Sequence, residues 1–194
     1  MNTWLGYLVY FGGFFVLILL RAPHEKVSKA TPIRENRMGF LERLLFASVG
    51  IGMLFFPILT ASSNWLVEFD HSIPIWALIT GTSVLAYSLW LFHRSHVDLG
   101  RNWSPTLQVR EGHTLVSHGV YQSIRHPMYT AIFLFSIGQL IVLPNWISGI
   151  AGFVGFGLMF VLRVSSEEKM MRDQFGAQYL AYSQRTKRIV PGIW

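Results

Sequence analysis

The feature that most constrains this chain is a run of 35 residues, from Met128 to Leu162, without a formally charged side chain. A soluble domain would have to cover such a run with other protein, whereas a lipid bilayer is its natural solvent. The run is too long for one membrane-spanning helix of about 20 residues and somewhat short for two. Near its middle lies Leu143-Pro-Asn-Trp146, where Pro removes a backbone donor and Asn favours a turn. We therefore predict a tight helical hairpin.

Hydrophobic residues make up 52% of the chain and charged residues 13%, well away from the average of globular proteins. We predict an all-α integral membrane protein with five transmembrane helices, of which the fourth and fifth form the hairpin. The first three helices correspond to stretches without Lys, Arg, Asp or Glu, each close to the roughly 20 residues of one span; they are Met1 to Leu20, Leu44 to Val67 and Ile73 to Phe92. Because no basic region precedes the first stretch and no small-residue cleavage pattern follows it, we expect a retained anchor.

The basic residues indicate the orientation, because Lys and Arg beside membrane helices are retained on the cytoplasmic side. All 16 lie within residues 21–43, 94–125 and 163–188. We therefore expect the amino terminus outside, and both polar segments that flank the hairpin, together with the carboxyl terminus, in the cytoplasm. Anionic headgroups explain the net charge of +6, so we expect a bilayer and no nucleic acid as partner. The absence of cysteine excludes disulfides, thiol nucleophiles and cysteine-ligated metals.

The polar connections differ in what they predict. Residues 21–43 contain two prolines and mixed charges and are predicted to form a polar loop, with an interfacial segment near Phe40. Residues 93–127 are too apolar for a disordered segment and are predicted to fold against the membrane face. Glycines in the fifth helix, among them Gly152 and Gly155, predict close helix packing. After Arg163 we predict a cytoplasmic helix with a packing face formed by Met171, Phe175, Tyr179 and Tyr182.

Two polar groups stand at the ends of the charge-free run. Arg163 and Glu167 are four residues apart, so on one helix they share a face and can pair or jointly face a ligand. The alternative is an interfacial Arg that reaches the headgroups beside its Glu partner. His126 and Pro127 open the fourth helix, with Tyr129 on the same turn. Free backbone donors at such an end favour a ligand carboxylate, although a capping His is the commoner situation.

Other motifs argue against other classes of site. His93 and His96 have a spacing that metal sites sometimes use, but H-E-x-x-H and repeated histidine boxes are missing from the sequence. We interpret both as interface histidines and expect no metal. The phosphate-loop pattern and a strand followed by G-x-G-x-x-G are also missing, so a soluble nucleotide-binding fold has no support.

Several short motifs in the second half of the chain occur in the order and at the spacing of a known family. They are His113-Thr-Leu-Val116, Gly119-Val-Tyr121, Arg125-His-Pro-Met-Tyr129, Asn145, Arg163 with Glu167-Glu168, and Phe175-Gly-x-x-Tyr179. On these residues the chain resembles the isoprenylcysteine carboxyl methyltransferases, a membrane family related to the phospholipid methyltransferases. The resemblance covers roughly Gln108 to Pro191, and the first helices agree only in hydropathy.

The resemblance implies S-adenosyl-L-methionine as methyl donor and S-adenosyl-L-homocysteine as product. It divides the chain into residues 1–92, three membrane helices with a cytoplasmic loop, and residues 93–194, a cofactor-binding and catalytic region with helices four and five and the C-terminal cytoplasmic helix. Arg163 is implied to bind the substrate and to be catalytic together with Glu167, and Glu168 completes the acidic pair of the wider family. The residues implied to surround the cofactor are Gln108, His113, Thr114, Leu115, Val116, Tyr121, His126, Pro127, Met128, Tyr129 and Glu167.

The implied reaction is methyl transfer to the alpha-carboxylate of an isoprenylated cysteine, which gives a methyl ester. Such a carboxylate is ionised at pH 7, so the reaction needs no strong base but an oxygen held in line with the sulfonium methyl. The planar fork of Arg163 matches two carboxylate oxygens. Glu167 would orient Arg163 or balance the positive charge of the cofactor, and a tunnel that opens to lipid would admit the prenyl chain.

Three other functions stay open at this stage. N-methylation of phosphatidylethanolamine would ask for a base, because an ammonium must lose a proton before it attacks. An NADPH-dependent membrane reductase is a further alternative, since sterol reductases resemble the carboxyl-terminal architecture of this family. A non-enzymatic membrane scaffold would bind no cofactor. Within the first function, the acceptor is a prenylated cysteine or another isoprenoid lipid.

Overall fold

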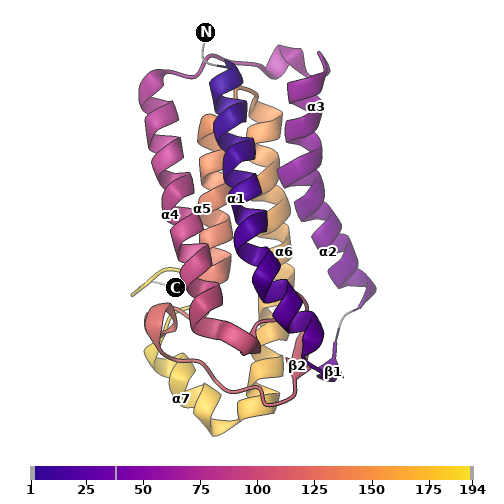
Figure 1. Ribbon diagram of the computed structural model, residues 1–194, viewed down its shortest axis with the longest axis vertical. Helices are drawn as coiled ribbons and strands as arrows, with labels where there is room; N and C mark the ends of the chain where they lie inside the picture. Colours follow the sequence, from indigo (N-terminus) through magenta and orange to yellow (C-terminus); the bar gives the residue numbers. More distant parts are fainter. Residues whose placement is uncertain (1–2, 38, 193–194) are drawn as a thin grey trace.

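The computed structural model describes residues 3–37 and 39–192. Long helices run side by side, and a small sheet and a short helix lie at one end of the bundle, which we call the polar end (Figure 1). The opposite end carries the connection between α3 and α4 and the turn between α5 and α6. The elements are α1 (Thr3–Ala30), β1 (Ile33–Asn36), α2 (Phe40–Gly50), a π-helical turn (Ile51–Phe55), α3 (Phe56–Ser62), α4 (Ile75–Leu99), β2 (Gln108–Arg110), α5 (Pro127–Val142), α6 (Trp146–Phe175) and α7 (Ala177–Arg185), with 3-10 turns at Val67–Phe69, Gly100–Asn102 and Gly119–Gln122.

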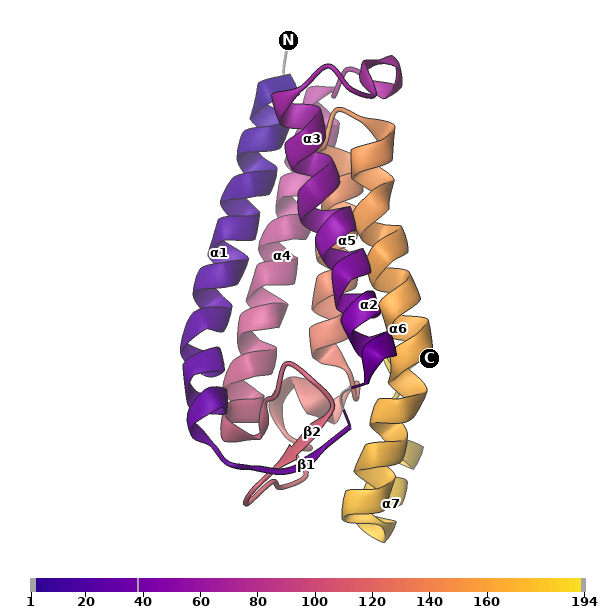
Figure 2. The same cartoon turned by 90° about the vertical axis from the view of Figure 1, so that its right-hand side faces the viewer.

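The long helices have the length and hydropathy of membrane spans. Four such segments are found among the described residues, and a fifth apolar helix, α5, is shorter, with 16 residues. The second span is composite, because α2, the π-helical turn and α3 follow one another without a break (Figure 2). The chain is therefore a multi-pass, mostly helical membrane protein. The four full-length segments are Thr3–Ala30, Phe40–Ser62, Ile75–Asn102 and Trp146–Phe175.

The helical hairpin turns where the sequence predicts it. α5 ends at Val142 and α6 begins at Trp146. Asn145 caps α6, because its Oδ1 accepts a hydrogen bond of 3.1 Å from the backbone N–H of Ser148. The Nδ2 group of Asn145 donates to the backbone oxygen of Leu66 (2.8 Å) and to Asp70 Oδ1 (2.6 Å). Asn145, one of the family-like motifs, therefore fastens the end of the bundle that lies farthest from the polar end.

The predicted polar loop at residues 21–43 is only partly a loop. α1 continues to Ala30 with Pro23 inside it, and Glu25 pairs with Arg21 (3.6 Å) and Lys29 (2.9 Å) along one face of this part of the helix. The prediction of an all-α protein also needs correction. β1 and β2 form an antiparallel pair in which Glu35 lies opposite Val109, and the pairing stabilises two extended segments that no helix periodicity marks.

Two helix boundaries also differ from the prediction. α4 extends to Leu99, so the predicted boundary between residues 92 and 93 falls inside a helix, and the last two residues of the region 93–194 lie outside the described part. The single C-terminal helix is two helices, because Gly176 adopts φ +50° and ends α6. Only a residue that tolerates positive φ makes this break at no steric cost. Met171 and Phe175 therefore belong to α6, and Tyr179 and Tyr182 to α7.

A polar group is buried between the helices at mid-bundle. Pro57 has no N–H to donate to the carbonyls one turn before it, at Gly52 and Met53. The Tyr10 hydroxyl donates to Met53 O (2.5 Å), and Gln139 Nε2 donates to Gly52 O (2.9 Å) and to Ser148 O (2.7 Å). Tyr10 OH also lies 3.0 Å from Gln139 Oε1. This mid-bundle network joins α1, the composite span, α5 and α6 in a place where an unpaired carbonyl would be costly.

The helices approach closely around this network because of glycines. A Cβ at Gly152 would clash with the Gln139 side chain, and one at Gly155 would lie 3.1 Å from the carbonyl carbon of Ser48. The predicted close packing at these two glycines is therefore confirmed.

Candidate active site

A cavity lies at the polar end. It is bounded by the end of α4, the segment Trp103–Gln108, which we call the strap, the first turns of α5, the middle of α6, and α7. Pro127, one of the residues implied to surround the cofactor, is fully buried in the first turn of α5 and does not line the cavity. The remaining ones line it: Gln108, His113, Thr114, Leu115, Val116, Tyr121, His126, Met128, Tyr129 and Glu167; Arg163 lines it as well.

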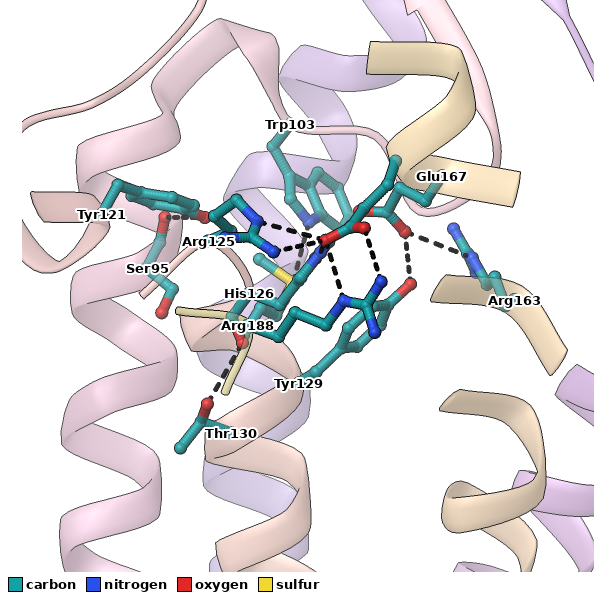
Figure 3. A network of polar contacts seen from close by, with 12 residues as sticks. Ser95, Trp103, Tyr121, Arg125, His126, Tyr129, Thr130, Arg163, Glu167 and Arg188 are labelled. Atoms are coloured by element: carbon teal, nitrogen blue, oxygen red, sulfur yellow. Dashed lines mark hydrogen bonds and ion pairs between the residues drawn. The ribbon is translucent and has the colours of Figure 1, made fainter. Parts of the chain in front are cut away.

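Glu167 lies where α6 faces the start of α5. The Tyr129 hydroxyl donates to Glu167 Oε2, and Arg163 Nε lies 3.6 Å from the same oxygen (Figure 3). His126 Nδ1 lies 3.6 Å from Glu167 Oε1, and the His126 and Tyr129 rings stack with their centroids 5.3 Å apart. The hairpin therefore brings the two polar groups together at one end of the bundle, and Glu167 presents a carboxylate to the cavity.

Glu168 has different surroundings, because consecutive residues of a helix point about 100° apart. Its Oε1 accepts hydrogen bonds from Arg125 Nε (3.1 Å) and Arg188 Nε (3.2 Å), and its Oε2 accepts one from Arg188 (2.9 Å). A further nitrogen of Arg125 donates to the backbone oxygens of Ser183 and Thr186, next to the end of α7. The Glu168 carboxylate thus fastens the C-terminal segment to α6 and does not line the cavity.

The C-terminal segment also holds the start of α5. The backbone N–H of Arg125 donates to Lys187 O (2.7 Å), and that of His126 donates to Arg188 O (2.9 Å). The Thr130 hydroxyl donates to Ile189 O (2.8 Å). His126 therefore enters the site from a backbone that is fixed on both sides. No local sequence signal predicts this pairing, because its two partners lie about 60 residues apart.

The backbone of the motif Gly119-Val-Tyr121 makes the contacts that hold this turn in place. Gly119 has φ +59°, and a Cβ on it would clash with the Asp98 carboxylate. Asp98 accepts a hydrogen bond of 2.9 Å from the N–H of Val120 and thereby holds the 3-10 turn against α4. Burial raises the pKa of Tyr182 to about 12, so its hydroxyl stays a neutral donor to Tyr121 O at 2.7 Å. These contacts place Tyr121 in the cavity wall.

The histidines of the site differ in charge. Burial by itself lowers the pKa of His126, but hydrogen bonds and charge interactions with Glu167 and Glu168 reverse the effect, and the net pKa is above its ordinary value. Burial lowers the pKa of His113. His126 is therefore stabilised as a cation between two acids, and His113 as a neutral ring.

Arg163 is 7% exposed and is surrounded on several sides. Both of its terminal nitrogens lie 3.4 Å from the backbone oxygen of Pro105 in the strap, and one lies 3.3 Å from Glu42 Oε1. The Phe46 ring centroid is 5.3 Å from Arg163 Cζ. Sequence reasoning missed Glu42 and Pro105, because one lies in the predicted polar loop and the other acts through its backbone.

Other residues of the cavity were also missed or interpreted as packing. Trp103 Nε1 lies 3.3 Å from Met128 Sδ, and Asn102 Oδ1 accepts a hydrogen bond of 2.9 Å from the N–H of Thr114. Tyr179 and Tyr182, predicted as a packing face, line the cavity. The sequence signal for Trp103 was that a large apolar side chain stands within a polar connection.

The unused polar atoms of the cavity fit a polar ligand. Four residues that line it carry a buried nitrogen or oxygen without a hydrogen-bond partner among the described residues: Thr106 Oγ1, His113 Nδ1, Arg163 Nε and the Tyr179 hydroxyl. Such atoms are costly unless a ligand or water completes them. The same cavity has an apolar part, formed by Phe46, Ile132 and Met159.

Comparisons with known proteins agree on one family. A model of the isoprenylcysteine carboxyl methyltransferase family matches residues 76–173, about half of the chain. Protein-S-isoprenylcysteine O-methyltransferase B of Arabidopsis thaliana is 37% identical over 99 residues, which are 50% of this chain and 50% of that protein. The human protein-S-isoprenylcysteine O-methyltransferase is 32% identical over 120 residues, which are 61% of this chain and 42% of that protein. The chain spans about half the length of the curated relatives it matches.

A solved structure has a similar fold. It is described as the eukaryotic intramembrane Ras methyltransferase ICMT, and it matches with a TM-score of 0.56 and 24% sequence identity over 96% of this chain and 63% of that one. The similarity shows that the two chains share the same overall arrangement of helices.

Proposed function

Because the chain belongs to the isoprenylcysteine carboxyl methyltransferase family, we propose that it methylates the alpha-carboxylate of an isoprenylated cysteine with S-adenosylmethionine as donor. The observation that carries the proposal is Arg163, a buried cation that lines a cavity with a polar and an apolar part. A permanent cation at such a place matches a substrate that joins a carboxylate to a hydrocarbon chain.

Arg163 would hold the carboxylate. Its guanidinium lines the cavity, and its Nε makes no hydrogen bond among the described residues but lies 3.6 Å from Glu167 Oε2. Bound S-adenosylmethionine supplies a methyl group on a positive sulfur; the carboxylate oxygen forms the new O–C bond, the S–C electron pair stays on sulfur, and S-adenosylhomocysteine is left. No proton leaves in this step, so holding the oxygen in place is the main task of the chain.

Glu167 and its neighbours would hold the positive cofactor. The Glu167 carboxylate faces the cavity and is fixed by the Tyr129 hydroxyl. His113 and Tyr179 offer a ring nitrogen and a hydroxyl without partners among the described residues.

The prenyl chain would enter from the membrane side. Phe46, Ile132 and Met159 come from α2, α5 and α6 and line the part of the cavity next to the bundle. The polar end would lie in the cytoplasm, as the distribution of Lys and Arg predicts. The beginning of α1, at the opposite end in Figure 1, would then face the outside.

The proposal is tested by methyl transfer from labelled S-adenosylmethionine to N-acetyl-S-farnesylcysteine by the purified protein, with phosphatidylethanolamine in a parallel assay. We expect a base-labile methyl ester on the first acceptor and no label on the second. Calorimetry with S-adenosylhomocysteine and NADPH tests the cofactor. Label on the phospholipid, or binding of NADPH alone, would contradict the proposal.

A further inference from the structure

Glu42 is a buried acid in the half of the chain that the family model does not match. It lies in the first turn of α2, where an acid is ordinarily stabilised by the helix dipole at the surface. Here the side chain is only 5% exposed. A carboxylate with so little contact to solvent needs a partner of opposite charge.

The partners of Glu42 belong to two parts of the cavity wall. Its Oε1 lies 3.3 Å from a terminal nitrogen of Arg163 and accepts a hydrogen bond of 3.1 Å from the N–H of Leu107 in the strap. The same guanidinium lies 3.4 Å from the oxygen of Pro105, two residues before Leu107. Glu42, Arg163 and the strap therefore form a closed triangle of contacts.

The strap connects this triangle to the cofactor side of the cavity. It ends at Gln108, which lines the cavity and pairs with Asn36 as the first residue of β2. The N–H of Arg37 donates to Leu107 O at 2.8 Å, so the main chain at Leu107 is held on both sides, by Arg37 and by Glu42. One carboxylate thus touches the group that would hold the substrate and the segment that would hold the cofactor.

We propose that Glu42 is a positioning residue: its charge keeps the Arg163 guanidinium turned toward the strap, and its oxygen keeps the strap in place beside the cofactor. This inference rests on the proposed function. Without the charge of Glu42, Glu167 is the acid that still contacts Arg163, at 3.6 Å. The guanidinium would then turn toward Glu167 and away from the position in which it receives a substrate carboxylate.

Two substitutions separate the two contacts. In Glu42→Gln the amide oxygen still accepts the hydrogen bond from Leu107, but the charge is lost; in Glu42→Ala both contacts are lost. We expect Glu42→Gln to lower kcat/KM for N-acetyl-S-farnesylcysteine about tenfold, with the Kd of S-adenosylhomocysteine within about twofold of wild type. Glu42→Ala should lower kcat/KM further and also raise that Kd about tenfold. Glu42→Asp, which keeps the charge, should retain more activity than Glu42→Gln.

The control is Glu68→Gln, because Glu68 is an exposed acid at the opposite end of the bundle. It should leave kinetics and binding unchanged. Glu42→Gln with wild-type or higher kcat/KM would overturn the proposal. It would show that the negative charge of Glu42 either does not contribute to catalysis or competes with the substrate carboxylate for Arg163. Equal losses of cofactor affinity in Glu42→Gln and Glu42→Ala would overturn it as well, because the hydrogen bond to the strap would then be irrelevant.

A second measurement does not depend on activity. Thermal unfolding of Glu42→Gln, Arg163→Gln and the double variant forms a cycle in which paired residues give non-additive effects. We expect the double variant to be destabilised less than the sum of the single variants, and additive effects would contradict the pairing. If the wild-type protein does not methylate N-acetyl-S-farnesylcysteine, the proposed function fails, while this cycle and the S-adenosylhomocysteine titrations still decide the role of Glu42.

Discussion

The mid-bundle network around Gln139 and the cluster around Arg163 are both buried and polar, yet only at Gln139 does every polar atom of the central side chain have a hydrogen-bond partner. Gln139 has partners for its amide oxygen and for both amide hydrogens. Arg163 and three other residues of the cavity each leave a buried polar atom without a hydrogen-bond partner among the described residues. A complete neutral network stabilises the bundle, whereas an incomplete charged one is suited to receive a ligand. On the proposed function, this difference separates a network that stabilises the fold from a cluster that binds a ligand.

The largest effect on activity is expected for Arg163→Ala. Because no other side chain in this position offers the guanidinium fork, we expect kcat/KM for N-acetyl-S-farnesylcysteine to fall at least about 100-fold. The Kd of S-adenosylhomocysteine should change little. Steady-state kinetics and calorimetry on the same preparation check both, and Arg163→Lys shows how much of the function a point charge restores. Full methyl transfer by a folded Arg163→Ala protein would remove the basis of the proposed function.

The mid-bundle network should show the reverse pattern with Gln139→Leu. The substitution leaves the carbonyl of Gly52 without its donor, and such a buried group costs about 1–3 kcal/mol. We expect a clear fall in the thermal unfolding temperature, with the KM for the prenylcysteine and the Kd of the cofactor product unchanged in the folded protein. A selective change in KM without loss of stability would mean that this network is not merely structural.

A smaller effect on activity is expected for Tyr129→Phe. It removes the hydroxyl that donates to Glu167 and keeps the ring that stacks on His126. We expect the Kd of S-adenosylhomocysteine to rise about fivefold to tenfold, since the Glu167 carboxylate loses its fixed orientation. Calorimetry measures this change, and Tyr87→Phe, an exposed tyrosine on α4, is the matched control.

The smallest effect is a dependence of stability on pH. The pKa of His126 is raised in the folded protein, so its stabilising contribution is fully present below the unfolded value of about 6.5 and is lost as the pH rises through the higher folded value. The difference in unfolding temperature between wild type and His126→Gln should therefore shrink from about pH 5.5 to about pH 8.5. A difference that grows over this range would show that the neutral form of His126 is the stabilised one.

Hydropathy and turn chemistry predicted the arrangement of the helices, including the turn before Trp146 and the close approach at Gly152. They failed where a local pattern competes with a distant partner. The strand pair of β1 and β2 joins segments about 75 residues apart, and Gly176 divides a stripe that has an unbroken helical period. Both depend on contacts or backbone angles that residue spacing does not contain.

The candidate site shows the same division. All the residues that the resemblance assigned to the cofactor line the cavity, with the exception of Pro127. The sequence did not reveal Glu42, which reads as an ordinary helix-terminal acid, or the C-terminal segment that holds His126. The resemblance assigned Glu167 and not Glu168 to the cofactor, and Glu167 is the one that lines the cavity.

The sequence by itself determined that this chain belongs in a membrane, where its helices turn, and which polar groups meet at one end, because hydrophobicity and charge are properties of short segments. Only the tertiary structure decided which of these groups have all their partners. Arg163 is held by Glu42 from another helix and by a backbone oxygen of the strap. Such contacts arise from the packing of segments that lie far apart in the sequence. They decide whether a buried polar side chain has all its partners within the protein, as Gln139 has, or keeps an atom without a hydrogen bond, as Arg163 does.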